Sequence, residues 1–148
     1  MRTPFDGLRA TDAASVNAFV KEYLPGFVGM EFLSLNPERV CARLPIRREL
    51  MAPNQFLHAA SLVALLDTCC GFGTIINLPA DASGFTTVEL KSNFIGTLRQ
   101  GEVHCEAVPV HLGRNTQLWD ATASDPDTGR KLALFRCTQM ILYPRSSS

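Results

Sequence analysis

The chain has 148 residues, of which 46% are hydrophobic, 19% charged and 8% aromatic. This composition is globular and excludes a disordered, collagen-like or coiled-coil protein, and the length fits one domain over residues 1–148. Lys and Arg number 14 and Asp and Glu number 14, so the formal net charge is zero. We therefore expect neither nucleic acid nor an anionic membrane as a partner.

The cysteines and the N-terminus indicate the cellular compartment. No Cys-x-x-Cys pair occurs, which excludes a zinc knuckle and a thioredoxin-type redox site. The cysteines are expected to be small apolar residues in a reducing compartment. Residues 1–9 lack the apolar segment of a secretion signal, so we expect a cytoplasmic protein. The five cysteines are Cys41, Cys69, Cys70, Cys105 and Cys137.

The first third of the chain predicts a helix and a hairpin. Apolar residues at helical spacing follow a Thr-Asp capping pair and predict an amphipathic helix over Thr11–Leu24. Pro25 and Gly26 are expected to stop this helix. Two β-like runs, Met30–Leu35 and Arg39–Leu44, flank an Asn-Pro-Glu turn and predict an antiparallel hairpin. The residues between this hairpin and His58 are expected to form a loop.

The segment from His58 to Asn77 contains twenty residues with a single charge, Asp67. Its length could span a bilayer, but the central carboxylate, two glycines and the absence of flanking cations make a membrane span the minor alternative. We predict a helix buried on nearly all sides. In a chain this short, the remaining residues must wrap around it.

Four β-rich runs follow this helix, and their three connections are short enough for antiparallel hairpins. In the last run, Leu132, Leu134, Thr138, Met140 and Leu142 fall on one face. An open sheet has exposed edges, and pairing two copies removes one edge from each. The runs are Phe85–Ile95, Glu102–Leu112, Thr116–Ser124 and Lys131–Tyr143.

The predicted fold class is α+β. Six antiparallel strands wrap one long central helix, a short helix precedes them, and the core spans about residues 29–143. Residues 144–148 are expected to be a disordered tail.

Several chemistries are excluded by the motifs that the sequence lacks. A Gly-x-Ser-x-Gly elbow, a Walker loop and a His-Glu-x-x-His helix do not occur. Gly71-Phe72-Gly73 lacks the third glycine of a dinucleotide fingerprint and lies inside the predicted helix. The three histidines show no metal-ligand spacing, so we expect no metal and no cofactor.

Asp67 is the candidate for chemistry. A carboxylate in a buried helix costs several kcal/mol unless it is paired or solvated. It must therefore face a polar cavity or a partner surface. One alternative is a structural carboxylate that accepts hydrogen bonds from neighbouring groups. The other is a general base or nucleophile at the edge of an apolar pocket.

The start of the helix offers a second chemical group. The free N–H groups of its first turn, His58-Ala59-Ala60, and the positive end of its dipole suit a developing oxyanion. Asp67 lies eight residues further on, about 12 Å along the axis, so one chain cannot apply both groups to one carbonyl. A two-fold pairing could bring them together, which predicts an active site shared by two subunits.

Three ordered motifs resemble acyl-CoA thioesterases of the hotdog fold, of the phenylacetate-pathway type. The resemblance implies that Asp67 acts as base or nucleophile in thioester hydrolysis and that the Ala59 N–H binds the thioester carbonyl. It also implies that Thr87 assists from the opposite subunit and that dimers pair into tetramers. The motifs are Leu57-His-Ala-Ala-Ser-Leu-Val-Ala-Leu-Leu-Asp67, Phe85-Thr-Thr-Val-Glu-Leu-Lys-Ser-Asn-Phe94 and His111-Leu-Gly-Arg114.

The chain departs from the family pattern at two places. The family commonly has His-Gly-Gly where this chain has alanines after His58. An upstream Asn-x-x-Gly pattern would fall on Ala52 and Gln55. The amide that helps to place the attacking water must then come from Asn54 or Gln55.

The resemblance also points to loops that would hold coenzyme A, which enters as part of the substrate. Loop arginines can bind its phosphates by charge-assisted hydrogen bonds, and a glycine permits close approach. The alternatives are a solvated turn residue for Arg99, a polar helix-start residue for His58 and a strand former for Thr87. Trp119 and Phe135 are expected in the core or an interface. The candidate coenzyme A residues are Thr97, Arg99, Gly113, Arg114 and Asn115.

The sequence therefore favours hydrolysis of an acyl-CoA thioester by a homodimer or a dimer of dimers. A second hypothesis is a hotdog dehydratase acting on 3-hydroxyacyl thioesters, which would need a histidine; the nearby candidate, His58, lies at the wrong end of the helix. A third is a non-catalytic acyl-CoA binding protein, consistent with alanine at positions 52 and 59.

Overall fold

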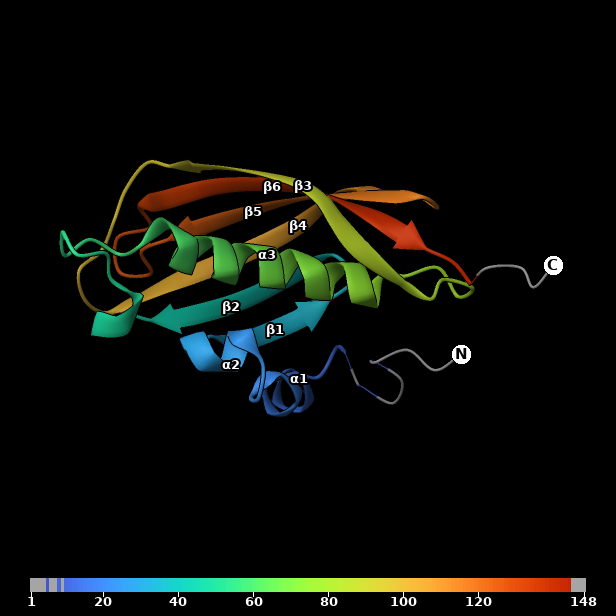
Figure 1. Ribbon diagram of the computed structural model, residues 1–148, viewed down its shortest axis with the longest axis horizontal. Coiled ribbons are helices and arrows are strands. Elements are labelled where there is room, and N and C mark those ends of the chain that lie inside the picture. The colour runs from blue at the N-terminus through green and yellow to red at the C-terminus, as the bar shows by residue number, and fades with distance from the viewer. Residues whose placement is uncertain (1–4, 6–7, 9, 145–148) are drawn as a thin grey trace.

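The computed structural model describes Phe5, Leu8 and residues 10–144, and it consists of one curved sheet around a central helix (Figure 1). The expected tail therefore lies outside the described residues from position 145 on. The elements in chain order are α1 (Ala13–Val20), α2 (Leu24–Val28), β1 (Glu31–Asn36), β2 (Arg39–Pro45), a 3-10 turn η1 (Arg48–Leu50), α3 (Ala59–Ile76), β3 (Gly84–Phe94), β4 (Glu102–Leu112), β5 (Thr116–Ser124) and β6 (Lys131–Leu142).

The six strands form one antiparallel sheet in the order β1-β2-β4-β5-β6-β3. This confirms the predicted fold class and the hairpin of β1 and β2. The expectation of a hairpin between β3 and β4 is wrong, because β3 pairs with β6. The intervening segment crosses between distant strands, and the N–H groups of Ile95 and Gly96 donate to the Leu132 carbonyl.

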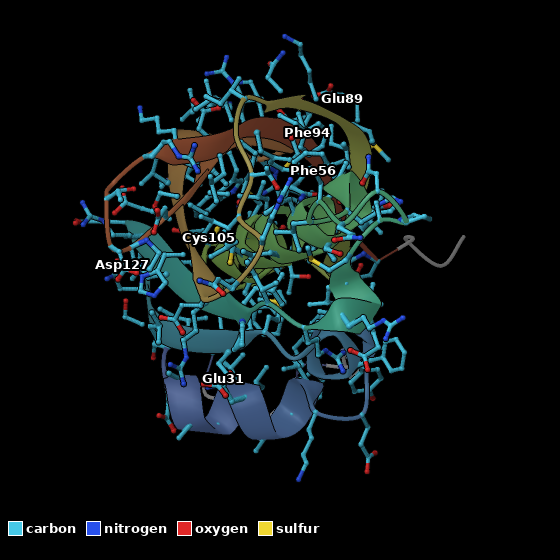
Figure 2. The ribbon with its side chains drawn as sticks, turned by 90° about the vertical axis from the view of Figure 1, so that its left-hand side faces the viewer. Glu31, Phe56, Glu89, Phe94, Cys105 and Asp127 are labelled. Atoms are coloured by element: carbon cyan, nitrogen blue, oxygen red, sulfur yellow. The ribbon has the colours of Figure 1, made fainter. Side chains whose placement is uncertain are left out.

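The predicted central helix is confirmed as α3, and the sheet curves around it (Figure 2). Its buried face carries Leu65, Leu66, Cys69 and Cys70, with the apolar residues of the sheet opposite. A Cβ on Gly73 would lie 2.4 Å from the Trp119 ring, so this glycine lets the indole pack directly on the helix.

Burial of α3 on nearly all sides is wrong. Half of its 18 residues are buried, and the face that carries Asp67, Thr68 and Gly71 is only partly covered. The helix has a mean hydropathy of 1.7 and is long and apolar enough to cross a membrane by composition. Here the sheet covers its apolar face, because a single-layer sheet can cover only one side of a helix.

The predicted N-terminal helix is divided in two. The Asp12 carboxylate caps α1 by accepting from the Ala14 N–H, as the capping pair predicted. Pro25 and Gly26 do not stop the helix but lie within α2, because proline is tolerated in a first helical turn. The Asn17 side chain bonds both the N–H and the carbonyl of Phe32, which fixes α1 to the edge strand β1 (Figure 1).

Most of the apolar face predicted for β6 faces solvent in this chain, although Leu132 at the start of the strand is fully buried. Leu134, Met140 and Leu142 are 40%, 42% and 39% exposed, whereas the alternate residues, among them Phe135, Gln139 and Ile141, face the helix. Both faces of this strand are apolar, so periodicity alone did not tell them apart. Trp119 and Phe135 are core residues, and all five cysteines are free, four of them buried.

Candidate active site

Asp67 lies in the middle of α3 on its partly covered face. Its Oδ1 is buried and accepts no hydrogen bond from the described residues, the only such side-chain oxygen or nitrogen among them. Removal from water raises the pKa of the Asp67 carboxyl above its ordinary value. Among the described residues of one chain, Oδ1 therefore lacks the neighbouring donor that the structural alternative requires.

This carboxyl borders a cavity of about 380 Å³ between α1, α2, α3 and β3. The N-terminal helices supply one wall, and the aromatic rings of Phe72 and Phe85 supply part of the other. An apolar environment with one carboxyl group suits a base whose proton affinity is raised. The lining residues are Phe5, Phe19, Val20, Tyr23, Pro25, Asp67, Thr68, Gly71, Phe72, Ile75, Phe85 and Thr87.

Thr87 borders the same cavity as Asp67 of its own chain. Its hydroxyl donates a 2.7 Å hydrogen bond to Oε1 of Gln139, which is fully buried on β6. With its proton engaged there, the hydroxyl oxygen is left as an acceptor. The Thr87 side chain thus has a specific partner in addition to its place in the strand, and a role across the subunit boundary stays a prediction.

The start of α3 is formed by His58 and Ala59. The Ala60 N–H donates to His58 Nδ1 at 2.9 Å, so the imidazole caps the helix, as its structural alternative proposed. Ala59 is the first helical residue, and its N–H cannot have a partner inside the helix. Eight residues separate it from Asp67, about 12 Å along the axis, so the two groups do not meet in one chain.

The candidate amides lie in the loop before α3, away from the cavity that Asp67 borders. Asn54 Oδ1 accepts from the Phe56 N–H at 3.2 Å and so stabilises the turn. Gln55 adopts a positive φ of 68°, a conformation that suits glycine better. Both are exposed, and within one chain neither reaches Asp67, so a role in placing water stays a prediction.

A second cavity, of about 690 Å³, lies beside this loop and is bordered by Arg47, Arg48 and Arg99. The Arg99 guanidinium stacks 5.0 Å from the ring centre of Phe56, a residue labelled in Figure 2. Arg47 donates to the Phe27 carbonyl at the end of α2. Arg99 is therefore part of a cationic cluster rather than an isolated turn residue.

The remaining candidates for coenzyme A binding do not join this cluster in one chain. Thr97 accepts from Arg130 through its carbonyl. Arg114 lies at the other end of β4, roughly 30 Å away, where Asp81 pairs with it at 2.7 Å. A Cβ on Gly113 would lie 2.4 Å from His111, and the Asn115 carbonyl accepts from Ile141, so both residues shape a tight turn.

Several residues that border the two cavities or lie behind them were not predicted from the sequence. Arg47 and Arg48 are adjacent in the segment expected to be a plain loop, and this pair of cations was a visible signal. Gln139 interrupts an apolar strand, which also marks it. The aromatic wall from Phe19 and Tyr23 gave no signal, since helical apolar residues usually form core.

The chain belongs to the Thioesterase superfamily, whose family profile matches residues 54–131. The match covers the loop before α3, all of α3 and the strands β3 to β5. Together with the topology above, this identifies the chain as a hotdog-fold member of the Thioesterase superfamily.

Known proteins of this class resemble the chain over most of its length. A mutant thioesterase from Pseudomonas aeruginosa is 26% identical with a TM-score of 0.84, covering 90% of this chain and 95% of that one. A thioesterase from Haemophilus influenzae, 21% identical, shares the fold with a TM-score of 0.83 over 89% of this chain and 91% of that one. A 1,4-dihydroxy-2-naphthoyl-CoA hydrolase from Listeria monocytogenes is 25% identical over 111 residues, 75% of this chain and 89% of the relative.

Proposed function

We propose that the protein hydrolyses an acyl-CoA thioester to the free acid and coenzyme A, with Asp67 as the general base or nucleophile. The observation that carries this proposal is the buried Asp67 oxygen without a hydrogen-bond partner beside an apolar cavity. The carboxyl group borders the cavity, so a water molecule or thioester bound there would lie next to it, and no described donor competes for Oδ1.

In the general-base route, Asp67 takes a proton from water as the water oxygen bonds to the thioester carbonyl carbon. The resulting oxyanion accepts a hydrogen bond from the N–H of Ala59 of the partner subunit. The carbon–sulfur bond then breaks, and the proton passes to the sulfur of coenzyme A. The raised pKa of Asp67 suits both proton acceptance and proton return.

This route needs a second copy of the chain, and the two sheet edges differ in a way that supports one. Asn17 and α1 cover the edge strand β1, whereas no described helix covers the outer edge of β3. Pairing through β3 would also place a second chain near the partly covered face of α3. Pairing of two such dimers stays a prediction, and the surface that we propose for it is the outer face of β6, where Leu134, Met140 and Leu142 are exposed.

The cationic cavity is the proposed site for the coenzyme A phosphates. Arg48 and Arg99 lie beside the start of α3, where the thioester carbonyl would sit, and guanidinium groups suit phosphate oxygens. Coenzyme A then serves as part of the substrate rather than as a cofactor. The free thiols fit the reducing cytoplasm, where we expect the protein to act.

The test is thiol release from a panel of acyl-CoA esters by the parent and by Asp67→Asn. Removing a general base should lower kcat about a thousandfold while the dimer stays folded. Asp127→Asn, an exposed carboxylate in a turn away from α3, is the matched control and should keep parental turnover (Figure 2). Parental rates for Asp67→Asn would overturn the assignment, and enoyl-CoA product would indicate the dehydratase instead.

A further inference from the structure

We propose that Gln139 is a positioning residue for hydrolysis: it fixes the direction of the Thr87 hydroxyl, whose oxygen then accepts a hydrogen bond from the attacking water. This inference rests on the proposed thioesterase function and adds to it how the water beside Asp67 is oriented. Thr87 touches the water, whereas Gln139 acts only through Thr87. Thr87 and Asp67 border the same cavity of one chain.

The place of Gln139 follows from the register of the sheet. On its inner face, Gln139 of β6 lies between Gln117 of β5 and Thr87 of β3, so the three side chains form a row across neighbouring strands (Figure 1). Gln139 is fully buried, and Gln117 is 1% exposed. Thr87 borders the cavity, so this row of polar side chains leads from the core to the cavity wall.

The Gln139 amide is costly where it lies. Its neighbours on the inner face of β6, Cys137 and Ile141, are buried, and a buried amide needs partners at both of its ends. Nε2 donates to the Cys137 sulfur at 3.4 Å, and sulfur is a weak acceptor. Oε1 accepts from the Thr87 hydroxyl at 2.7 Å. The stronger hydrogen bond of this amide is therefore the one that leads to the cavity.

That hydrogen bond decides which way the Thr87 hydroxyl points. A hydroxyl has one proton and two lone pairs, and here the proton is directed at Oε1 of Gln139. Toward the cavity, the Thr87 oxygen can therefore only accept. The ionised Asp67 carboxylate also only accepts, and its Oδ1 has no donor among the described residues. Thr87 and Asp67 thus offer two acceptors to one bound molecule.

Two acceptors suit a water molecule, because water has two O–H groups. One O–H donates to Asp67, which takes that proton as the water oxygen bonds to the thioester carbonyl carbon. The other O–H donates to Thr87, which leaves a lone pair of the water oxygen free to face the carbonyl carbon. Without the second acceptor, the water could rotate about its hydrogen bond to Asp67 and would attack less often.

Methanol provides the contrast for the experiment, because it has a single O–H group. It can pass its only proton to Asp67 and form a methyl ester, and it has no second proton for Thr87. The experiment therefore measures the free acid and the methyl ester that form from one acyl-CoA in dilute aqueous methanol. In Gln139→Leu and in Thr87→Val, hydrolysis should fall about fivefold, whereas methanolysis should stay within about twofold of the parent. The ratio of methyl ester to acid should rise accordingly.

Gln117→Leu is the matched control, since it removes a neighbouring buried amide that does not bond Thr87. Gln117 instead donates to the Asn77 carbonyl and accepts from the Trp119 indole. This variant should be less stable than the parent but keep the parental product ratio. Gln139→Glu is the conservative variant, because its carboxyl group keeps an oxygen that accepts from Thr87 in either protonation state. It should restore the parental ratio.

An unchanged product ratio in a folded Gln139→Leu variant would overturn the proposal, and so would an equal rise in Gln117→Leu. If Gln139→Leu does not fold, Thr87→Val takes its place and must show the same rise. If the parent forms acid but no methyl ester, the hydrolysis rates decide, and Gln139→Glu must regain what Gln139→Leu loses; equal rates in these two variants would contradict the assignment.

The parent distinguishes failure of this inference from failure of the proposed function. Normal hydrolysis by the parent with an unchanged ratio in the variants would refute the role of Gln139 alone. A folded parent that releases no thiol from any acyl-CoA would refute the proposed function and this inference with it.

Discussion

Two cavities of this small domain, one beside Asp67 and one beside the loop before α3, differ in size, polarity and charge. The cavity beside Asp67 is lined largely by apolar side chains, several of them aromatic, and it borders a carboxyl group whose Oδ1 has no hydrogen-bond partner among the described residues. The cavity beside the loop before α3 is larger and is bordered by three arginines. One suits an apolar group and a proton transfer, and the other suits anionic phosphates.

In the proposed function, the fold binds the apolar and the anionic parts of one substrate in these two separate cavities. Both cavities border α3 or the loop that leads into it, so a single helix sets their spacing. Changes in the apolar cavity should alter kcat and the choice of acyl group. Changes in the cationic cavity should alter KM for substrates that carry phosphates.

The largest effect expected from the cationic side comes from the double variant Arg48→Ala/Arg99→Ala. Loss of charge-assisted hydrogen bonds to phosphate should raise KM for an acyl-CoA roughly tenfold to a hundredfold, with kcat nearly unchanged. Steady-state kinetics measure this.

The control for that variant is an acyl-pantetheine thioester, which lacks the nucleotide phosphates. Its KM should be the same in the parent and the double variant. If the double variant binds both thioesters as the parent does, the cationic cavity is not the phosphate site.

A smaller effect is expected from Gln139→Leu, in the core behind Thr87 of the apolar cavity. The substitution removes the acceptor of the Thr87 hydroxyl, so the hydroxyl would point elsewhere. Loss of about 1 kcal/mol of positioning would lower kcat roughly fivefold, and KM would change little. Thr87→Val should cost a similar factor, and the double variant no more than either alone. Additive losses would show that the two residues act separately.

The smallest effect concerns stability and its pH dependence. Burial raises the pKa of Asp67 in the folded chain, whereas the unfolded chain has the ordinary value. Below the ordinary pKa, the Asp67 carboxyl is protonated in both the folded and the unfolded chain, so no charge is buried and this difference in pKa does not affect stability. As pH rises from there through the raised folded pKa, the unfolded state ionises first and the folded state loses stability.

An asparagine at position 67 cannot ionise, so the Asp67→Asn variant does not lose this stability as pH rises. The variant should be more stable than the parent by about 1 kcal/mol at neutral pH and equally stable at about pH 3. Urea unfolding at both pH values measures the difference. A variant less stable than the parent at neutral pH would mean that the native carboxylate has a stabilising partner.

Much of the fold could be predicted because local sequence patterns determine where the helices and strands lie. The single charge in twenty residues marked α3, and alternating strands with short turns marked the sheet. The pairing of β3 with β6 could not be predicted, because it depends on the contacts of distant strands rather than on the Ile95–Gly101 connection. Which face of β6 is buried could not be predicted either, since both faces of the strand carry apolar residues.

A site residue could be predicted from the sequence where its charge did not match its apolar neighbours. Asp67 is a charge in an apolar helix, and it was found for that reason. Arg114 looked like a free loop cation, but Asp81 and the Tyr143 ring engage it. The aromatic wall was missed because Phe19 and Tyr23 look like core residues until the fold leaves a cavity behind them.

Mixing two inactive variants tests directly whether Asp67 of one subunit acts with the start of α3 in the other. Asp67→Asn lacks the carboxylate. Ala59→Pro lacks the N–H, and proline is tolerated at the first position of a helix. Each alone should be nearly inactive.

Unfolding and reassociating the two variants together gives a mixed dimer with one intact site if the site is shared. Activity should then return to about a quarter of the parental value, because half of the dimers are mixed and each has one working site. If each site belongs to a single chain, every site in the mixture lacks one group. A mixture of verified mixed dimers that stays as inactive as its components would contradict the account.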